Sequence, residues 1–172
     1  HINEGGLCDI SDADKFKLID EVSRSGWIEL LDIELRYGQE KLNEWSDTLR
    51  ERSIRLVISH HDFNEYIKPE KVYEMLKKQQ DYGADICKLI TKIDSCMDLI
   101  NFSKALIEAR QDFLTVPLIA GVVGDNSPLM RVFGDFFGSD MTFVTAAGNP
   151  SHPTQIHIDQ VRAIRDLVLN SR

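Results

Sequence analysis

The sequence is poor in cysteine, has no long apolar run and carries no excess of positive charge. Its three cysteines, Cys8, Cys87 and Cys96, form neither an even set nor a C-x-x-C pair. A disulfide framework and a zinc site are therefore disfavoured, and a reducing compartment is favoured. No apolar stretch approaches the roughly 18 residues of a membrane helix, and the first residues do not resemble a signal peptide. Because the net charge of −8 also disfavours nucleic acid, we expect a cytoplasmic protein that binds neither membrane nor nucleic acid.

Nucleotide-binding motifs are missing too, since no G-x-G-x-x-G or P-loop sequence follows any apolar segment. His152 and His157 are not spaced as metal ligands, and we expect neither a metal nor an organic cofactor. The chain has an ordinary globular composition, with 42% hydrophobic and 28% charged residues among 172. That length and composition predict a single domain spanning residues 1–172.

Short apolar segments alternate with amphipathic ones along the whole chain. Predicted strands begin near Trp27, Ile54, Ala84, Val116 and Asp140. Predicted helices cover residues 11–25, 39–51, 69–81, 96–112, 127–136 and 157–170, with Ser11 and Asn126 as caps and Pro69 and Pro128 in first turns. This alternation predicts parallel strands with right-handed crossovers, in either a doubly wound sheet or a (β/α)8 barrel.

Alternation within each strand predicts which side chains share a face. In the first strand, Leu31, Ile33 and Leu35 suit the helix-covered side, which leaves Asp32 and Glu34 facing inward. The two carboxylates either act in a site or form a buried pair that a nearby Lys or Arg neutralises.

The second and third strands carry the candidates for catalysis. The apolar residues of the second strand place Ser59 and His61 inward and His60 outward, and Lys88 shares a face with Ile86 and Ile90. Desolvation in an apolar strand should lower the pKa of Lys88 toward the range in which a neutral amine attacks a carbonyl. Histidine suits proton transfer near neutrality. The pattern predicts an imine-forming lysine with a histidine proton shuttle, unless Lys88 simply extends from the strand end into solvent.

Several motifs, from the first residues to the last, are similar to those of one enzyme family. They are Glu4-Gly-Gly6, Asp32-Ile-Glu34, Ser59-His-His-Asp-Phe63, Gly83-Ala-Asp-Ile-Cys-Lys88, Arg131, Phe137-Gly-Ser139, Thr142-Phe143 and Ser151-His-Pro-Thr-Gln155. With them the sequence resembles the type I 3-dehydroquinate dehydratases of the shikimate pathway, and S-x-H-D-F followed by G-A-D-x-x-K is the most specific pair. The resemblance implies an α/β fold of the (β/α)8 TIM barrel type. It also implies a lyase that converts 3-dehydroquinate to 3-dehydroshikimate and water through a lysine Schiff base.

The resemblance further implies roles for individual residues. Lys88 would form the imine, and His61, held by Glu4, would act as general base and then as general acid. Arg131 would bind the substrate carboxylate, joined by Ser151 and Gln155. Phe143, Asp32 and Glu34 complete the expected substrate site, in which the two carboxylates tune the charges of Lys88 and His61.

The sequence departs from the family pattern in three places. A complete barrel of this type has about 80 more residues before the E-G-G motif, with three strands and an arginine, whereas only three residues precede Glu4. His152 and Thr154 replace family residues in the last motif, and residues 120–124 replace a segment often rich in methionine. We therefore expect a partial barrel, the C-terminal portion, of about five strands and six helices with two unpaired edges. Alone it would have little or no activity, and it would form a homodimer or bind the upstream piece.

Two other functions stay open. One is a non-catalytic or regulatory relative, or a stable fragment, that keeps the barrel pieces without turnover. The other is a different lysine-imine barrel, such as an aldolase, which the S-x-H-D-F motif disfavours.

Overall fold

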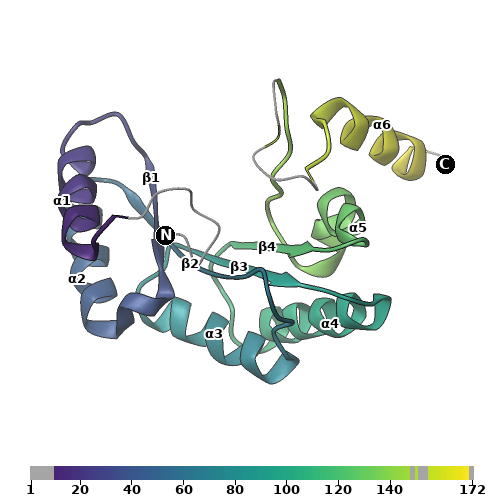
Figure 1. Cartoon of the computed structure of the whole chain (residues 1–172), viewed down its shortest axis with the longest axis horizontal. Helices are drawn as coiled ribbons and strands as arrows, with labels where there is room; N and C mark the ends of the chain where they lie inside the picture. Colours follow the sequence, from purple (N-terminus) through teal and green to yellow (C-terminus); the bar gives the residue numbers. More distant parts are fainter. Residues whose placement is uncertain (1–9, 148–149, 151–154, 171–172) are drawn as a thin grey trace.

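Four parallel strands and six α-helices make up the described part of the chain, residues 10–147, 150 and 155–170, in the computed structural model (Figure 1). The strands are β1 (Leu30–Glu34), β2 (Arg55–Asp62), β3 (Ile86–Lys92) and β4 (Leu118–Val123). The helices are α1 (Asp12–Ser23), α2 (Gly38–Glu51), α3 (Pro69–Asp81), α4 (Cys96–Asp112), α5 (Ser127–Phe133) and α6 (Ile158–Leu169). Two 3-10 helices, η2 (Leu35–Tyr37) and η3 (Gly134–Phe137), follow β1 and α5.

Sequence signals explain several helix ends. Ser11 caps α1 by accepting a hydrogen bond from the Asp14 amide at 3.1 Å, as predicted. Ser95 and Asp98 form a capping box at α4, and Pro69 occupies the first turn of α3. No helix in the described ranges is long and apolar enough to cross a membrane.

The strands lie in the order β1-β2-β3-β4, each parallel to its neighbour. One face, here called the helix-covered face, bears Ile33, Ile58, Leu89 and Leu118 and packs in the main core. Buried helix residues of that core include Leu42 and Leu49 of α2, Leu76 of α3 and Phe102 of α4, and α3 and α4 lie along this side of the sheet in Figure 1. Leu31 and Leu35 also pack against it, which confirms the predicted face of the first strand.

The opposite face, here called the inner face, carries a small separate cluster of Val57, Ile86 and Ile119. By strand alternation, Ser59 and His61 share this face with Val57, and Lys88 shares it with Ile86. The predicted inward residues of β2 and β3 therefore lie on one face, away from the main core.

The described residues form four paired strands where about five were predicted, because the segment near Asp140 joins β4 by one bridge only, Ile119 to Met141. The Asp140 amide donates to the Leu118 carbonyl, as it would at the start of a strand, and the Leu118 amide donates to the Asp140 carboxylate, both at 2.7 Å. The ladder of strand hydrogen bonds ends there, because the Ala120 amide donates to the Ser139 hydroxyl at 2.8 Å and the Arg131 guanidinium donates to the Phe143 carbonyl at 3.2 Å. The helix predicted over residues 127–136 likewise ends at Phe133 and continues as η3.

Candidate active site

Lys88 extends from β3 over the inner face and meets a carboxylate. Its Nζ lies 2.8 Å from Asp32 Oδ2, and its side chain is only 15% exposed. The ring of Phe143 lies 5.2 Å from the same nitrogen, a distance typical of a cation–π contact. The lysine is therefore enclosed by an acid on one side and an aromatic ring on the other, and it does not extend freely into solvent.

His61 lies on the same face, on the neighbouring strand. The register pairs Ser59 with Lys88 and His61 with Ile90, so His61 is one inward position closer to the carboxyl end of the sheet. The His61 ring stacks on Phe63, with centroids 5.7 Å apart. Between them Asp62 accepts hydrogen bonds from the amides of Asn64 and Glu65, which ends the strand in a tight turn. The S-x-H-D-F motif thus presents His61 at the carboxyl end of β2, where barrel enzymes have their active sites.

The G-A-D-x-x-K motif fixes where β3 begins. Gly83 has a φ of +88°, which side chains with a Cβ rarely adopt, and its carbonyl accepts a hydrogen bond from Ser46 Oγ at 3.0 Å. Asp85 binds both backbone groups of Leu56: its amide donates to the Leu56 carbonyl at 2.9 Å, and its carboxylate accepts from the Leu56 amide at 2.8 Å. These contacts set the register of β3 on β2, and so the height of Lys88 relative to His61.

Gln79 is a residue of this site that the sequence analysis missed. It lies in α3, is fully buried, and exchanges two hydrogen bonds with the backbone of Lys88, Nε2 to the carbonyl at 2.9 Å and Oε1 from the amide at 3.1 Å. Val72, Leu76 and Gln79 are the buried residues of α3. The spacing of Gln79 from the two apolar residues is therefore a signal that could have identified it.

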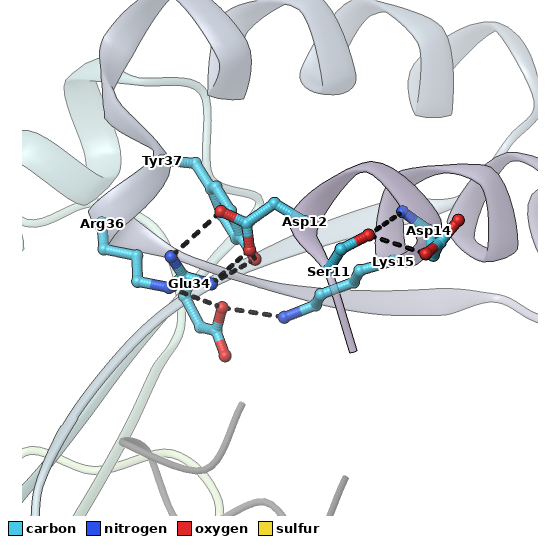
Figure 2. A network of polar contacts seen from close by, with 7 residues as sticks. All are labelled: Ser11, Asp12, Asp14, Lys15, Glu34, Arg36 and Tyr37. Carbon is cyan, nitrogen blue, oxygen red and sulfur yellow. Dashed lines mark hydrogen bonds and ion pairs between the residues drawn. The ribbon is translucent and has the colours of Figure 1, made fainter. Parts of the chain in front are cut away.

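Glu34 shares the inner face but belongs to a second polar network that joins β1 and η2 to α1 (Figure 2). Its carboxylate lies 2.8 Å from Lys15 Nζ and 3.3 Å from Arg36 Nε. Arg36 and the Tyr37 hydroxyl in turn contact Asp12, at 2.7 and 3.0 Å. The alternative of a buried acid neutralised by a nearby base therefore describes the contacts of Glu34, whereas Asp32 faces Lys88.

The environment shifts the pKa of several groups in this network. Burial pushes the pKa of Glu34 upward, but the hydrogen bond and positive charge of Lys15 help to bring it below its ordinary value. The hydrogen bond from Arg36 lowers the pKa of Asp12. Burial raises the pKa of the Tyr37 hydroxyl. At neutral pH Glu34 and Asp12 are therefore ionised and the Tyr37 phenol is neutral.

Arg131 lies in α5 beside the inner face. Its guanidinium donates to the Phe143 carbonyl at 3.2 Å, and burial lowers its pKa. Arg131 and Phe143 line a small pocket with Ile90, Gly121 and Met130, which connects them to the strand that carries Lys88. Gln155 is half-buried, while Glu4 and Ser151 lie outside the described residues.

Two residues near Lys88 have other roles. Cys87 faces α3, with its Sγ 3.9 Å from the Leu76 carbonyl, and burial raises its pKa to about 12, so it serves in packing. Lys92 pairs with Asp94 at 3.0 Å and its side chain is 37% exposed. Within the described ranges, no group of three or more His, Cys, Asp or Glu side chains is placed to hold a metal.

The sequence matches the model of a known family. The model of the type I 3-dehydroquinase family matches residues 1–171. The chain belongs to this family. A 3-dehydroquinate dehydratase from Klebsiella pneumoniae (strain 342) is 33% identical over 165 residues, which cover 96% of this chain and 65% of that protein. The 3-dehydroquinate dehydratase of Geobacillus kaustophilus (strain HTA426) is 36% identical over 167 residues, covering 96% and 63%.

Solved structures of type I 3-dehydroquinases have the same fold. The crystal structure of 3-dehydroquinate dehydratase from Geobacillus kaustophilus HTA426 matches with a TM-score of 0.92 and 33% identity, over 100% of this chain and 66% of that one. The four strands and their helices therefore form a partial (β/α)8 barrel, as the resemblance implied. The chain spans slightly less than two thirds of the length of these relatives.

Proposed function

We propose that the protein is a lyase that converts 3-dehydroquinate to 3-dehydroshikimate and water through a Schiff base on Lys88. The observation that carries the proposal is the position of Lys88, enclosed on the inner face by Asp32 at 2.8 Å, with His61 on the same face of the adjacent strand. Membership of the type I 3-dehydroquinase family supports the choice of substrate.

The chemistry explains why a lysine and a histidine are needed together. Dehydration of a β-hydroxy ketone requires loss of a proton next to the carbonyl, and a plain ketone makes that proton too weakly acidic for a protein base. An iminium on Lys88 accepts the electron pair that the C–H bond leaves behind. His61 takes the proton and then gives it to the departing hydroxyl group, so that water leaves and a C=C bond forms. Hydrolysis of the imine restores the Lys88 amine and releases the enone.

The other residues bind the substrate or stabilise the charges of Lys88 and His61. Asp32 is placed to accept the proton that Lys88 must lose before it attacks the carbonyl. The planar guanidinium of Arg131, partly withdrawn from water, suits the substrate carboxylate, with Phe143 and Gln155 beside it. By family likeness, Glu4 orients His61 and Ser151 joins Arg131, and Glu34 supports the site through β1. No organic cofactor or metal is required for these steps.

The setting of the protein is part of the same proposal. We place it in the cytoplasm, as one barrel domain that includes residues 1–172 and associates as a homodimer. Light scattering during size-exclusion chromatography measures the mass in solution, and a monomer at micromolar concentration contradicts the dimer.

Turnover tests the proposed reaction directly. Protein that contains residues 1–172 within a complete barrel should, when mixed with 3-dehydroquinate, produce the ultraviolet absorbance of the enone 3-dehydroshikimate, and mass spectrometry should show a product lighter by one water. Residues 1–172 alone should produce little or no enone. A covalent adduct with 3-dehydroquinate but no enone indicates a non-catalytic relative. Cleavage of a carbon–carbon bond in another carbonyl compound indicates an aldolase.

A further inference from the structure

Ser59 lies at the centre of the inner face, and the proposed reaction steps give its hydroxyl no role. It lies on β2, and the register places Glu34 of β1 on one side of it and Lys88 of β3 on the other. The residue is 1% exposed, and within the described part of the chain its Oγ has no hydrogen-bond partner. Buried hydroxyl groups are nearly always hydrogen-bonded, because desolvating one without a partner costs folding free energy.

The ion pair between Lys88 and Asp32 passes over this hydroxyl. Asp32 belongs to β1 and Lys88 to β3, so the 2.8 Å contact between them spans β2 on the face that carries Ser59. In the register Asp32 pairs with Val57 and Lys88 pairs with Ser59, which places the contact over these two residues. Ser59 therefore lies beneath the two charged groups that the proposed reaction changes.

Imine formation alters the donors that Asp32 receives. The Lys88 ammonium has three N–H bonds; one C=N bond forms to the substrate carbonyl carbon, the carbonyl oxygen leaves as water with two of the three protons, and the iminium keeps one. Among the described residues, Lys88 is the only hydrogen-bond donor to the Asp32 carboxylate, so this carboxylate loses donors at that step. Glu34 differs, because Lys15 and Arg36 already contact it.

We propose that Ser59 is a positioning residue whose hydroxyl donates to the Asp32 carboxylate once Lys88 is bonded to the substrate. The inference rests on the proposed function. A buried O–H below the ion pair supplies the donor that the iminium no longer provides, and so holds the carboxylate beside the iminium charge. A purely steric role needs only a small side chain, which alanine provides equally well, so Ser59→Ala separates the two roles.

The experiment measures the rate of covalent trapping. Protein is mixed with 3-dehydroquinate at a series of concentrations, quenched with borohydride after set times, and weighed intact. Ser59→Ala should form the adduct about 10-fold more slowly or worse at saturating substrate, the loss expected for one hydrogen bond to a charged group, with the half-saturating concentration changed less than about twofold. Ser59→Thr keeps the hydroxyl and should stay within about threefold of the unmodified protein.

Ser103 provides a matched control. It lies in α4, is 4% exposed, and its Oγ also has no partner in the described residues. Ser59→Ala and Ser103→Ala should both unfold at the same denaturant concentration as the unmodified protein or a higher one, but only Ser59→Ala should slow trapping.

Three results overturn the inference. Equal trapping rates for Ser59→Ala and the unmodified protein do so, as does a crystal structure of the reduced adduct with Ser59 Oγ beyond hydrogen-bonding distance of Asp32. Failure of the unmodified protein to form any adduct overturns the proposed function itself, and the inference with it.

Discussion

The proposed reaction depends on a few single side chains, and strand alternation determines which side chains face the site. His60 and His61 are adjacent in sequence but point to opposite faces of β2, because Ile58 packs in the main core and Val57 in the inner cluster. Only His61 shares a face with Lys88. The two histidines therefore form a natural comparison between a residue placed for proton transfer and one that is not.

Replacing His61 with alanine should leave imine formation possible but slow the elimination. A positioned general base typically contributes about 10²–10⁴-fold, and here the same side chain acts twice. The enone assay gives the loss of turnover, and borohydride trapping shows whether the imine still forms. The control is His60→Ala, whose effect should be mild; if it is the more damaging change, the assignment of faces on β2 is wrong.

Elements are held to each other by buried polar side chains as well as by apolar packing. The apolar periodicity was enough to predict α3 over residues 69–81 and α4 over residues 96–112, and both boundaries match the structure. It could not predict that the fifth strand would stop at one bridge, because that depends on Ser139 and Arg131 occupying backbone groups far away in sequence. The same periodicity could place Gln79 on the buried side of α3, but it could not predict that Gln79 would bind the backbone of Lys88.

The hydrogen bonds between Gln79 of α3 and the backbone of Lys88 in β3 should contribute measurably to the free energy of unfolding. Gln79→Ala leaves the amide and carbonyl of Lys88 without their side-chain partners and opens a cavity, so it should lower the free energy of unfolding by about 2–4 kcal/mol. Urea denaturation measures the change. Lys78→Ala on the same helix removes only an exposed ion pair with Glu74 and should leave the urea midpoint almost unchanged. Equal effects of the two changes would show that the Gln79 hydrogen bonds contribute little.

The link between α1 and β1 should depend on pH. The pKa of Glu34 is lower in the folded protein than its ordinary value of 4.5, so the unfolded chain binds this proton first as the pH falls. Its contribution is therefore fully present above about pH 4.5 and is lost as the pH falls through the lower, folded value.

Glu34→Gln should remove that dependence. The variant should be less stable than the unmodified protein at pH 7, by about 1–3 kcal/mol, because Lys15 loses its buried partner. The difference should shrink as the pH is lowered below about 4.5. Urea denaturation at several pH values measures it, with Glu44→Gln, an exposed acid paired with Lys41, as control. A difference that stays constant down to pH 3 would contradict the role of the Glu34 charge.

In the molecule as a whole, one face of the sheet packs in the main core and the other face carries the proposed catalytic residues. The helix-covered face forms the main core, while the inner face carries Lys88, His61 and Asp32 around the small cluster of Val57, Ile86 and Ile119. Sequence alternation was sufficient to place these polar residues inward, since a regular strand leaves no other arrangement. The actual partners were not predictable in the same way: Asp32 pairs with Lys88 across β2, whereas Glu34, two residues later, pairs with Lys15. Which base each acid meets depends on how α1 and the strands pack.

Every step proposed for this protein depends on a covalent imine between Lys88 and 3-dehydroquinate, and the position of the adduct is the decisive measurement. The protein is incubated with 3-dehydroquinate, reduced with borohydride, digested and mapped by mass spectrometry. We predict one reduced adduct, on Lys88, that is absent in Lys88→Met and unchanged in Lys92→Met, while Lys88→Met keeps its circular dichroism spectrum. An adduct on Lys92 that persists in Lys88→Met would show that Lys88 is not the imine-forming residue.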